Sequence, residues 1–211
     1  MKKFVSLISG GLDSPIASYL MIKKGFIPIF ISFLTSDDID HTLKLKVSKV
    51  VSELSKFTKY KVKLFFINHD SNLEKFINDC DRKLTCILCK RLMLRISKYI
   101  GKLENTNIII TGDIMGEQAS QTLDNLFAYQ NIMKEFIILR PLIGLNKHDI
   151  IKFNKELDLY EITSTQSAGC RYNPQYPETH AKSHEIIYSE SNLDIDSLIK
   201  NSINSVETLE F

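Results

Sequence analysis

The sequence predicts an α/β fold, a Rossmann-like parallel sheet with helices on both faces. Short apolar runs of strand length alternate along the chain with segments whose apolar residues recur at helical spacing. This alternation favours parallel pairing, because a crossover between parallel strands is long enough to hold a helix. The first run, residues 4–9, is largely apolar and therefore indicates a strand that is buried on both faces.

The other elements follow in order from that first strand. Residues 14–24 are predicted to form a helix that ends at Gly25. The further strands are expected at residues 27–33, 61–67, 107–111 and 136–139. The further helices are expected at residues 41–58, 71–80, 87–100 and from the cap Asn146 to about residue 157. We assign residues 1–182 to one domain and residues 183–211 to a C-terminal helical extension with one amphipathic stretch.

The composition is that of a globular protein. The 211 residues are 44% hydrophobic and 25% charged, with only 8 Gly and 5 Pro, which excludes collagen-like and wholly disordered chains. No run reaches the roughly 18 apolar residues of a membrane helix, and residues 1–11 lack the pattern of a signal peptide. We therefore expect a cytoplasmic protein with no membrane partner. In that compartment four cysteines indicate metal ligands or reactive thiols rather than disulfides.

The strongest motif is the loop that follows the first strand, Ser9-Gly10-Gly11-Leu12-Asp13-Ser14. Two adjacent glycines permit backbone conformations that other residues avoid, and they let a ligand approach the main chain. Successive N–H groups ahead of a helix, together with two hydroxyls, suit a phosphate chain. No lysine follows the glycines, so this is not the GxxxxGK[ST] loop of kinases and GTPases. The structural alternative is a tight strand-to-helix turn with a serine cap.

This loop resembles the SGGxDS motif of the PP-loop ATP pyrophosphatases, whose fold is adenine nucleotide alpha hydrolase-like. The resemblance implies an enzyme that cleaves ATP between its α- and β-phosphates and adenylates a carbonyl oxygen. It also implies that Asp13 helps to hold Mg²⁺ or to orient the pyrophosphate.

Later segments are similar to the 4-thiouridine synthetase (ThiI) branch of that family. They are KRLMLRIS at residues 90–97, TGDIMGEQASQTLDNL at 111–126 and LRPLIGLNKHDII at 139–151. The resemblance covers roughly residues 4–182 and implies an ATP-dependent tRNA sulfurtransferase. In that reaction a uridine carbonyl oxygen is adenylated, and sulfur then displaces AMP. The implied ATP contacts are Leu7, Ile8, Ser9, Gly10, Gly11, Asp13, Ser14, Ser32, Phe33, Lys90, Gly112 and Gln121.

Cations in these segments are candidates for contact with the α-phosphate. The resemblance makes Lys147 catalytic, together with Asp13 and Cys170, and a cation there would stabilise charge that develops during adenylation. Arg140 is a second candidate, which an ion pair beside a strand end explains equally well. For Lys90 the structural alternative is a solvated charge on a helix.

The cysteines indicate how sulfur arrives. Cys170 matches the catalytic-domain cysteine of the family, which in many members works with a cysteine on a fused rhodanese domain, and we expect that domain to be absent here. Cys86 and Cys89 form a CxxC. With Cys170 they resemble the three ligands of an iron–sulfur cluster in a subgroup of thiolation enzymes, where one open iron can bind hydrosulfide. The implied cofactors are ATP, Mg²⁺ and a 4Fe-4S cluster.

Other uses of the cysteines stay open. A redox disulfide across the CxxC can release sulfur from a persulfide on Cys170. A structural zinc would need a fourth ligand, for which Cys80, His180 or His184 are candidates. Packing in the core is the remaining alternative, and it is our interpretation of Cys80.

The expected partners are tRNA and a sulfur donor, either sulfide or a persulfide carrier. Family members carry a tRNA-binding THUMP module before the SGG loop, and with a strand at residue 4 we expect that module to be absent here. A separate tRNA-binding protein or a homodimer would then help to hold tRNA. The candidate RNA contacts are Arg91, Arg95 and Arg171, with Tyr172 as a stacking surface for a base. An ordinary solvated helix face explains the outer lysines equally well.

Two other functions remain open at this point. Absence of an RNA-binding module would also suit a PP-loop ligase or sulfurtransferase that acts on a small molecule, which salt-sensitive binding of tRNA would contradict. Small size would suit a nucleotide-binding, cluster-carrying subunit of a larger complex, which pyrophosphate release by the isolated chain would exclude.

Overall fold

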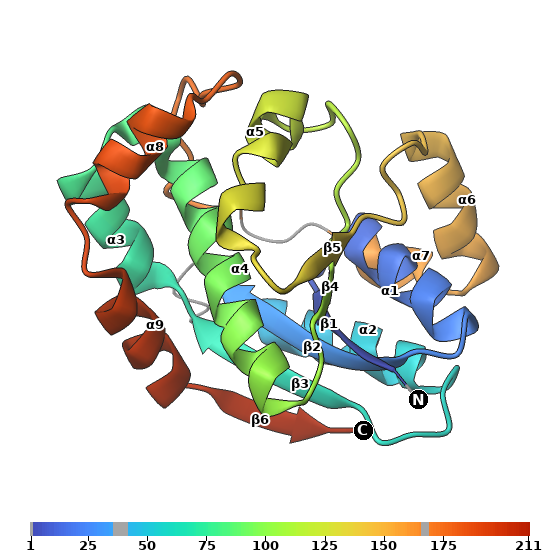
Figure 1. The fold of residues 1–211 in the computed structure, drawn as a ribbon. Coiled ribbons are helices and arrows are strands. Elements are labelled where there is room, and N and C mark those ends of the chain that lie inside the picture. Colours follow the sequence, from blue (N-terminus) through green and yellow to red (C-terminus); the bar gives the residue numbers. More distant parts are fainter. Residues whose placement is uncertain (1, 36–41, 166–168) are drawn as a thin grey trace.

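A six-stranded sheet runs through the part of the chain that the computed structural model describes, residues 2–35, 42–165 and 169–211. The strands lie in the order β5-β4-β1-β2-β3-β6, and helices cover both faces of the sheet (Figure 1). The pairs among β1 to β5 are parallel, whereas β6 is antiparallel to β3. The predicted α/β fold with its parallel core is confirmed.

Five of the six strands of the described chain lie close to their predicted places. They are β1 (Lys3–Leu7), β2 (Ile27–Leu34), β3 (Lys63–Asn68), β4 (Ile108–Ile110) and β5 (Ile137–Leu139). β6 (Glu207–Glu210) is the exception, because its short polar sequence gave no strand signal. Its register places Glu210 opposite Lys63. The C-terminal region, which we expected to be helical, thus also forms one edge of the sheet.

The described residues form nine α-helices and three short 3-10 turns. The helices are α1 (Asp13–Lys23), α2 (Thr42–Ser55), α3 (Asp70–Asp79), α4 (Thr85–Leu103), α5 (Leu123–Phe127), α6 (Lys147–Glu156), α7 (Tyr160–Thr163), α8 (Ser183–Glu190) and α9 (Ile195–Asn204). The predicted start of the second helix at His41 lies outside the described residues. Within the described ranges, no helix combines the length and apolar character that crossing a lipid bilayer demands.

Alternation along β1 divides its side chains between two hydrophobic layers. Phe4 packs in the layer that contains α1 and α2, and Val5 packs in the layer that contains α3 and α4. On α4, Leu88, Leu92 and Ile96 follow one another at intervals of four residues and are almost completely buried. Each buried side chain of this size stabilises the fold by about 1.5–3 kcal/mol. α4 is therefore held firmly against the sheet.

The strand order reverses beside β1, and this reversal indicates where a ligand binds. The chain passes from β1 through β2 to β3, and it then returns to β4 on the other side of β1. In open parallel sheets, ligands bind in the crevice beyond the carboxyl ends of the strands at such a switch point. The loop after β1 and the segment after β4 meet there.

Candidate functional site

A cavity of about 220 Å³ lies at the switch point between β1 and β4. The predicted ATP contacts Leu7, Ile8, Ser9, Asp13, Ser14, Phe33, Lys90, Gly112 and Gln121 line it. So do Met93, Thr111, Asp113 and Gln118, which were not among the predicted site residues. Among the described residues, the predicted contacts Gly10, Gly11 and Ser32 are not part of its lining. Motifs from distant parts of the sequence thus converge on one cavity.

Hydrogen bonds within the loop after β1 order it without a ligand. The N–H of Ser9 donates to Oγ of Ser14 at 2.8 Å, and the two hydroxyl oxygens lie 3.0 Å apart. The N–H of Gly11 donates to Oγ of Ser9 at 3.3 Å. α1 begins at Asp13, so its first N–H groups, which have no partner within the helix, lie at the same place. Hydroxyls and main-chain donors together suit a phosphate group.

Gly112 lets two backbones approach each other. A Cβ added at this position would lie 2.7 Å from the nitrogen and 2.8 Å from the Cα of Ser14. The end of β4 therefore packs directly on the first turn of α1, with no space for a side chain. The resemblance makes Gly112 a nucleotide contact, and the structure adds a separate reason for glycine here.

Asp13 and Lys147, two of the predicted catalytic residues, form an ion pair beside the cavity. Nζ of Lys147 donates to the two carboxylate oxygens of Asp13 at 2.8 and 3.0 Å, and it lies 3.5 Å from Oε1 of Glu117. Lys147 is the first residue of α6, whose start is fixed by a capping box between Asn146 and Asp149. The start of α6 therefore places the Lys147 cation beside the loop that follows β1.

Asp113 is a buried charge at the cavity. It lies in the motif at residues 111–126, but it was not among the predicted site residues. Asp113 is 1% exposed, and it accepts hydrogen bonds from Lys90 at 2.5 Å, Thr111 at 2.7 Å and Arg140 at 3.1 Å. Burial alone would raise its pKa, but the Lys90 cation, the hydroxyl of Thr111 and the Arg140 cation together hold the pKa below its usual value. Lys90 and Arg140 thus form ion pairs, and both pairs lie at the candidate site.

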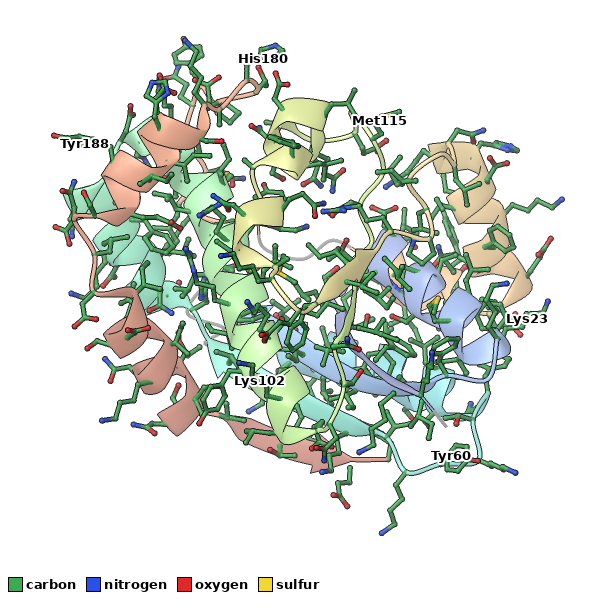
Figure 2. The ribbon with its side chains drawn as sticks, in the orientation of Figure 1. Lys23, Tyr60, Lys102, Met115, His180 and Tyr188 are labelled. Atoms are coloured by element: carbon green, nitrogen blue, oxygen red, sulfur yellow. The ribbon has the colours of Figure 1, made fainter. Side chains whose placement is uncertain are left out.

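A larger cavity of about 780 Å³ lies away from this site, between α4 and α9. Its lining includes three lysines, Lys98, Lys102 and Lys200, and Lys102 lies toward the end of α4 (Figure 2). Nζ of Lys98 is already bound to the main-chain oxygen of Ile132 at 2.7 Å. Of the predicted site residues in the described chain, only Arg95 lines this cavity. Volume alone therefore does not identify the functional site.

The cysteines of the predicted cluster come from two segments. Cys86 and Cys89 lie near the start of α4, and Sγ of Cys86 lies 3.7 Å from Oδ1 of Asn173. Burial raises the pKa of both thiols, and the nearby Cys170 raises it further in each case. The three sulfur atoms are therefore close enough to interact electrostatically.

The described side chains include no group of three or more His, Cys, Asp or Glu that is arranged to hold a metal ion. Of the candidate fourth ligands, Cys80 donates to the main-chain oxygen of Ser189 at 3.3 Å, and burial with the nearby Asp79 and Glu190 charges raises its pKa to about 11. Nδ1 of His180 lies 2.8 Å from a carboxylate oxygen of Asp124. Three thiols are suitable donors for an iron–sulfur cluster, but the described side chains are not arranged as a ligand set, so the cluster stays a prediction.

Two of the three predicted RNA contacts bind a carboxylate inside the protein. Arg91 is only 2% exposed, and it donates to both oxygens of Glu190 at 2.8 Å and to the main-chain oxygen of Ala128. Arg95 donates to the same carboxylate at 2.5 and 2.9 Å. Burial would raise the pKa of Glu190, but the two arginines lower it to about 2. The prediction that Arg91 contacts RNA is therefore wrong, and Arg95 shares its structural role in joining α4 to α8.

Arg171, the third predicted RNA contact, lies at the surface beside Cys170. Its guanidinium donates to Asp70 on α3 at 2.8 Å and to the hydroxyl of Tyr172 at 2.6 Å. Tyr172 is only 5% exposed, so the expectation that it stacks on a base is wrong. These contacts join the segment that carries Cys170 to α3.

Comparison with known sequences identifies the relatives of this chain. Residues 1–195 match the model of a family described as thiamine biosynthesis protein (ThiI). A probable tRNA sulfurtransferase of Methanosarcina mazei is 35% identical over 211 residues, which cover 99% of this chain and 51% of that protein. Another from Methanocaldococcus jannaschii is 39% identical over 193 residues, which cover 87% and 48% of the two chains. The chain thus spans about half the length of these curated relatives.

Comparison with solved structures agrees with the comparison of sequences. A crystal structure of a 4-thiouridine synthetase–RNA complex with bound ATP matches with a TM-score of 0.93 at 25% identity, covering 100% of this chain and 55% of that one. The NMN synthetase of Francisella tularensis, with a TM-score of 0.59 at 17% identity over 96% of this chain and 82% of its own, shares the fold alone. The sheet and its phosphate loop therefore form the PP-loop ATPase fold. By sequence and by structure, this chain belongs to the ThiI family.

Proposed function

We propose that this chain is the ATP-using catalytic unit of a cytoplasmic tRNA sulfurtransferase that makes 4-thiouridine. The supporting observation is the cavity where the Ser9–Ser14 loop meets the Asp13–Lys147 ion pair. Family membership supports the same reaction, and the structural neighbour with 25% identity was solved with ATP and RNA bound. The relatives are about twice as long as this chain, so the complete reaction is part of the proposal.

Activation of the base precedes sulfur insertion. The carbonyl oxygen of a uridine attacks the α-phosphorus of ATP, pyrophosphate leaves, and the oxygen becomes adenylated. A sulfur nucleophile then adds to the carbonyl carbon, and AMP departs with the oxygen. Adenylation is needed because the uracil oxygen is a poor leaving group, whereas AMP is a good one.

The residues at the cavity provide the charges that this first step requires. The hydroxyls and N–H groups of the loop after β1 bind phosphate oxygens. Carboxylate oxygens are the ligands that Mg²⁺ prefers, so Asp13 would hold this ion, which would supply positive charge to the phosphates. An Asp13 carboxylate engaged in this way would leave Lys147 free of its ion pair. Lys147 then stabilises the negative charge that develops at the α-phosphate.

We assign the sulfur step to Cys86, Cys89 and Cys170, which interact electrostatically near the start of α4. These thiols are the ligands that would hold an iron–sulfur cluster, which when bound supplies an open iron for hydrosulfide. In the alternative, the Cys86 and Cys89 thiols release hydrosulfide from a persulfide on Cys170 and supply the two electrons by becoming a disulfide. Anaerobic purification followed by iron, sulfide and zinc analysis distinguishes them. Iron with sulfide supports the cluster, zinc alone contradicts it, and absence of all three favours the persulfide.

The proposed partner is tRNA, held with the help of a homodimer or a separate tRNA-binding protein. Arg171 remains the predicted arginine with a surface position, next to Cys170. A gel shift with bulk tRNA at several salt concentrations tests whether the protein binds tRNA, because binding through phosphates weakens as the salt concentration rises. Binding that is absent, or that does not respond to salt, would contradict it.

Two substitutions test the two steps separately. Asp13→Ala should reduce pyrophosphate release by at least about a hundredfold, because Mg²⁺ would lose its carboxylate ligand beside the phosphates. Cys170→Ser should stop thiolation of tRNA but leave pyrophosphate release within about twofold of the unsubstituted protein, because adenylation needs no sulfur. Cys80→Ser is the matched cysteine control and should thiolate normally. Full thiolation by the Cys170→Ser protein would overturn the assignment of the sulfur site.

A further inference from the structure

Four donors converge on the buried carboxylate of Asp113. Lys90 and Gln121 donate to Oδ1, at 2.5 and 3.5 Å, whereas Thr111 and Arg140 donate to Oδ2, at 2.7 and 3.1 Å. These donors come from four separate elements of the described chain: α4, the end of β4, the 3-10 turn at Ala119–Gln121 and the end of β5. One carboxylate therefore fixes the relative positions of side chains that local structure alone would leave independent.

The groups directly around Asp113 carry a local excess of positive charge. One carboxylate faces two cations, Lys90 and Arg140, and all three groups are largely removed from water. The pKa of Asp113 is held low against its burial, so the carboxyl is ionised and only accepts hydrogen bonds. The remaining positive charge favours an anionic ligand.

Two buried polar atoms in this network lack a partner among the described residues, Nη2 of Arg140 and Oε1 of Gln121. Buried polar atoms in folded proteins are nearly always hydrogen-bonded, so each of these atoms is available to a water molecule or to a ligand. Because an ionised Asp113 cannot donate, the amide of Gln121 must turn its NH₂ group toward Asp113. Oε1 of Gln121 is then left as an acceptor, and Nη2 of Arg140 is left as a donor.

We propose that Asp113 is a positioning residue for the nucleotide. It holds Lys90 and Arg140 as a pair of cations for a phosphate oxygen, and it orients Gln121 so that Oε1 accepts a hydrogen bond from the same ligand. Asp113 itself acts through these three side chains. This proposal rests on the proposed function in one respect, that the ligand of the cavity is ATP.

Titration calorimetry with α,β-methylene ATP and Mg²⁺ tests the proposal without the sulfur step. Asp113→Asn should weaken binding at least tenfold, because an amide at this position presents a donor to Lys90 or Arg140. Asp124→Asn changes an exposed carboxylate in the same way and should bind as the unsubstituted protein does. Thr111→Val removes one hydroxyl and no charge, and should weaken binding about threefold. It keeps the proposal testable if Asp113→Asn fails to fold.

The double variant Asp113→Asn/Arg140→Met separates positioning from charge balance. If Asp113 served only to neutralise Arg140, removal of that cation would restore both the melting temperature and the affinity for the nucleotide. Positioning predicts that the melting temperature recovers while the affinity stays at least tenfold weaker than that of the Arg140→Met single variant, because Lys90 and Gln121 are still not oriented. Recovery of the affinity would overturn the proposal.

The experimental results distinguish failure of this proposal from failure of the proposed function. Equal affinity in the unsubstituted and Asp113→Asn proteins would refute positioning and leave ATP use intact. No binding by the unsubstituted protein would refute both. Normal dependence on Asp113 without any thiolation of tRNA would support positioning and count against the sulfurtransferase.

Discussion

Two regions of the molecule differ in how completely contacts within the protein fix their side chains. One is the nucleotide cavity, and the other, called the cysteine cluster below, consists of Cys86, Cys89 and Cys170. Around the cavity, hydrogen bonds hold together the Ser9–Ser14 loop, the Asp13–Lys147 pair and the Asp113 network, each within itself. The three cysteines lie close enough for Cys170 to raise the pKa values of Cys86 and Cys89, but within the described chain they form no group ready to hold a metal ion. One region is preorganised for its ligand, and the other is not.

This difference indicates how the two steps depend on their ligands. A preorganised cavity binds its nucleotide without a large cost of ordering side chains. The cysteines must lose protons and move together, and a metal or cluster can supply the free energy for that change because it binds thiolates strongly. ATP binding should therefore be robust in the isolated chain, whereas the sulfur step should depend on how the protein is prepared.

Gly112→Ala should produce the largest effect, and it should act on the nucleotide cavity. A methyl group 2.7 Å from the nitrogen of Ser14 must push β4 and α1 apart. Displacement of a ligand-binding loop by about 1 Å can cost a hundredfold in function, so we expect ATP affinity to fall by about that factor. Gly144→Ala is the matched control, because a Cβ there meets nothing within 4 Å. Calorimetry that finds similar affinities in both variants would show that the close packing is not needed.

Glu190→Gln should have an intermediate effect that reaches both regions, because Glu190 anchors α4. Loss of the charge leaves the buried Arg91 and the partly buried Arg95 without their partner and should lower the free energy of unfolding by about 3 kcal/mol at pH 7. The folded-state pKa of about 2 lies below the ordinary value of 4.5. The stabilisation is therefore complete above about pH 5 and is lost as the pH falls toward 2.

Urea unfolding at several pH values measures this difference. The unsubstituted protein should lose its advantage over the Glu190→Gln variant between about pH 5 and pH 2. Glu53→Gln removes the partner of an exposed lysine, Lys56, and should change stability by less than about 0.5 kcal/mol at any pH. A constant difference between Glu190→Gln and the unsubstituted protein across this range would contradict the assigned ion pair.

Asp70→Asn should have the smallest effect, confined to the cysteine cluster. The substitution removes a charge that holds Arg171, next to Cys170, against α3. We expect about 1 kcal/mol lower stability, a severalfold faster alkylation of Cys170 by iodoacetamide, and an unchanged affinity for ATP. Glu74→Gln, at the more distant and more exposed contact of Arg171, is the control. Unchanged alkylation of Cys170 would show that the Asp70 contact does not order this segment.

Local signals in the sequence were sufficient for most of the fold and for the phosphate loop. The apolar runs of β1 to β3 and the helical spacing of α4 identify elements because burial imposes those periods. The two glycines and two serines after β1 provide, within six residues, the accessible main chain and the hydroxyls that a phosphate ligand requires. The resemblance then linked Lys90, Gly112 and Gln121 to the same cavity, where they lie.

Contacts between distant segments could not be predicted in the same way. Arg91 looked like a surface cation in a basic stretch, and nothing nearby in the sequence shows that Glu190 lies against it. In the sequence, Asp113 follows Gly112, and the predicted nucleotide contact was assigned to Gly112 alone. The partners of Asp113, Lys90 and Arg140, lie on other elements. The ETLE sequence of β6 has no alternation, because its strand is defined by pairing with β3 rather than by burial.

The pairing of β6 with β3 also bears on the order in which the sheet is completed during synthesis. The seam is continued by two main-chain hydrogen bonds of 2.9 Å between Val62 and Phe211. β3 leaves the ribosome long before its outer neighbour exists, so its edge stays exposed while the parallel core forms. Such an edge invites pairing with other chains. A nascent chain stalled before residue 207 should therefore be more prone to aggregation than the finished sheet.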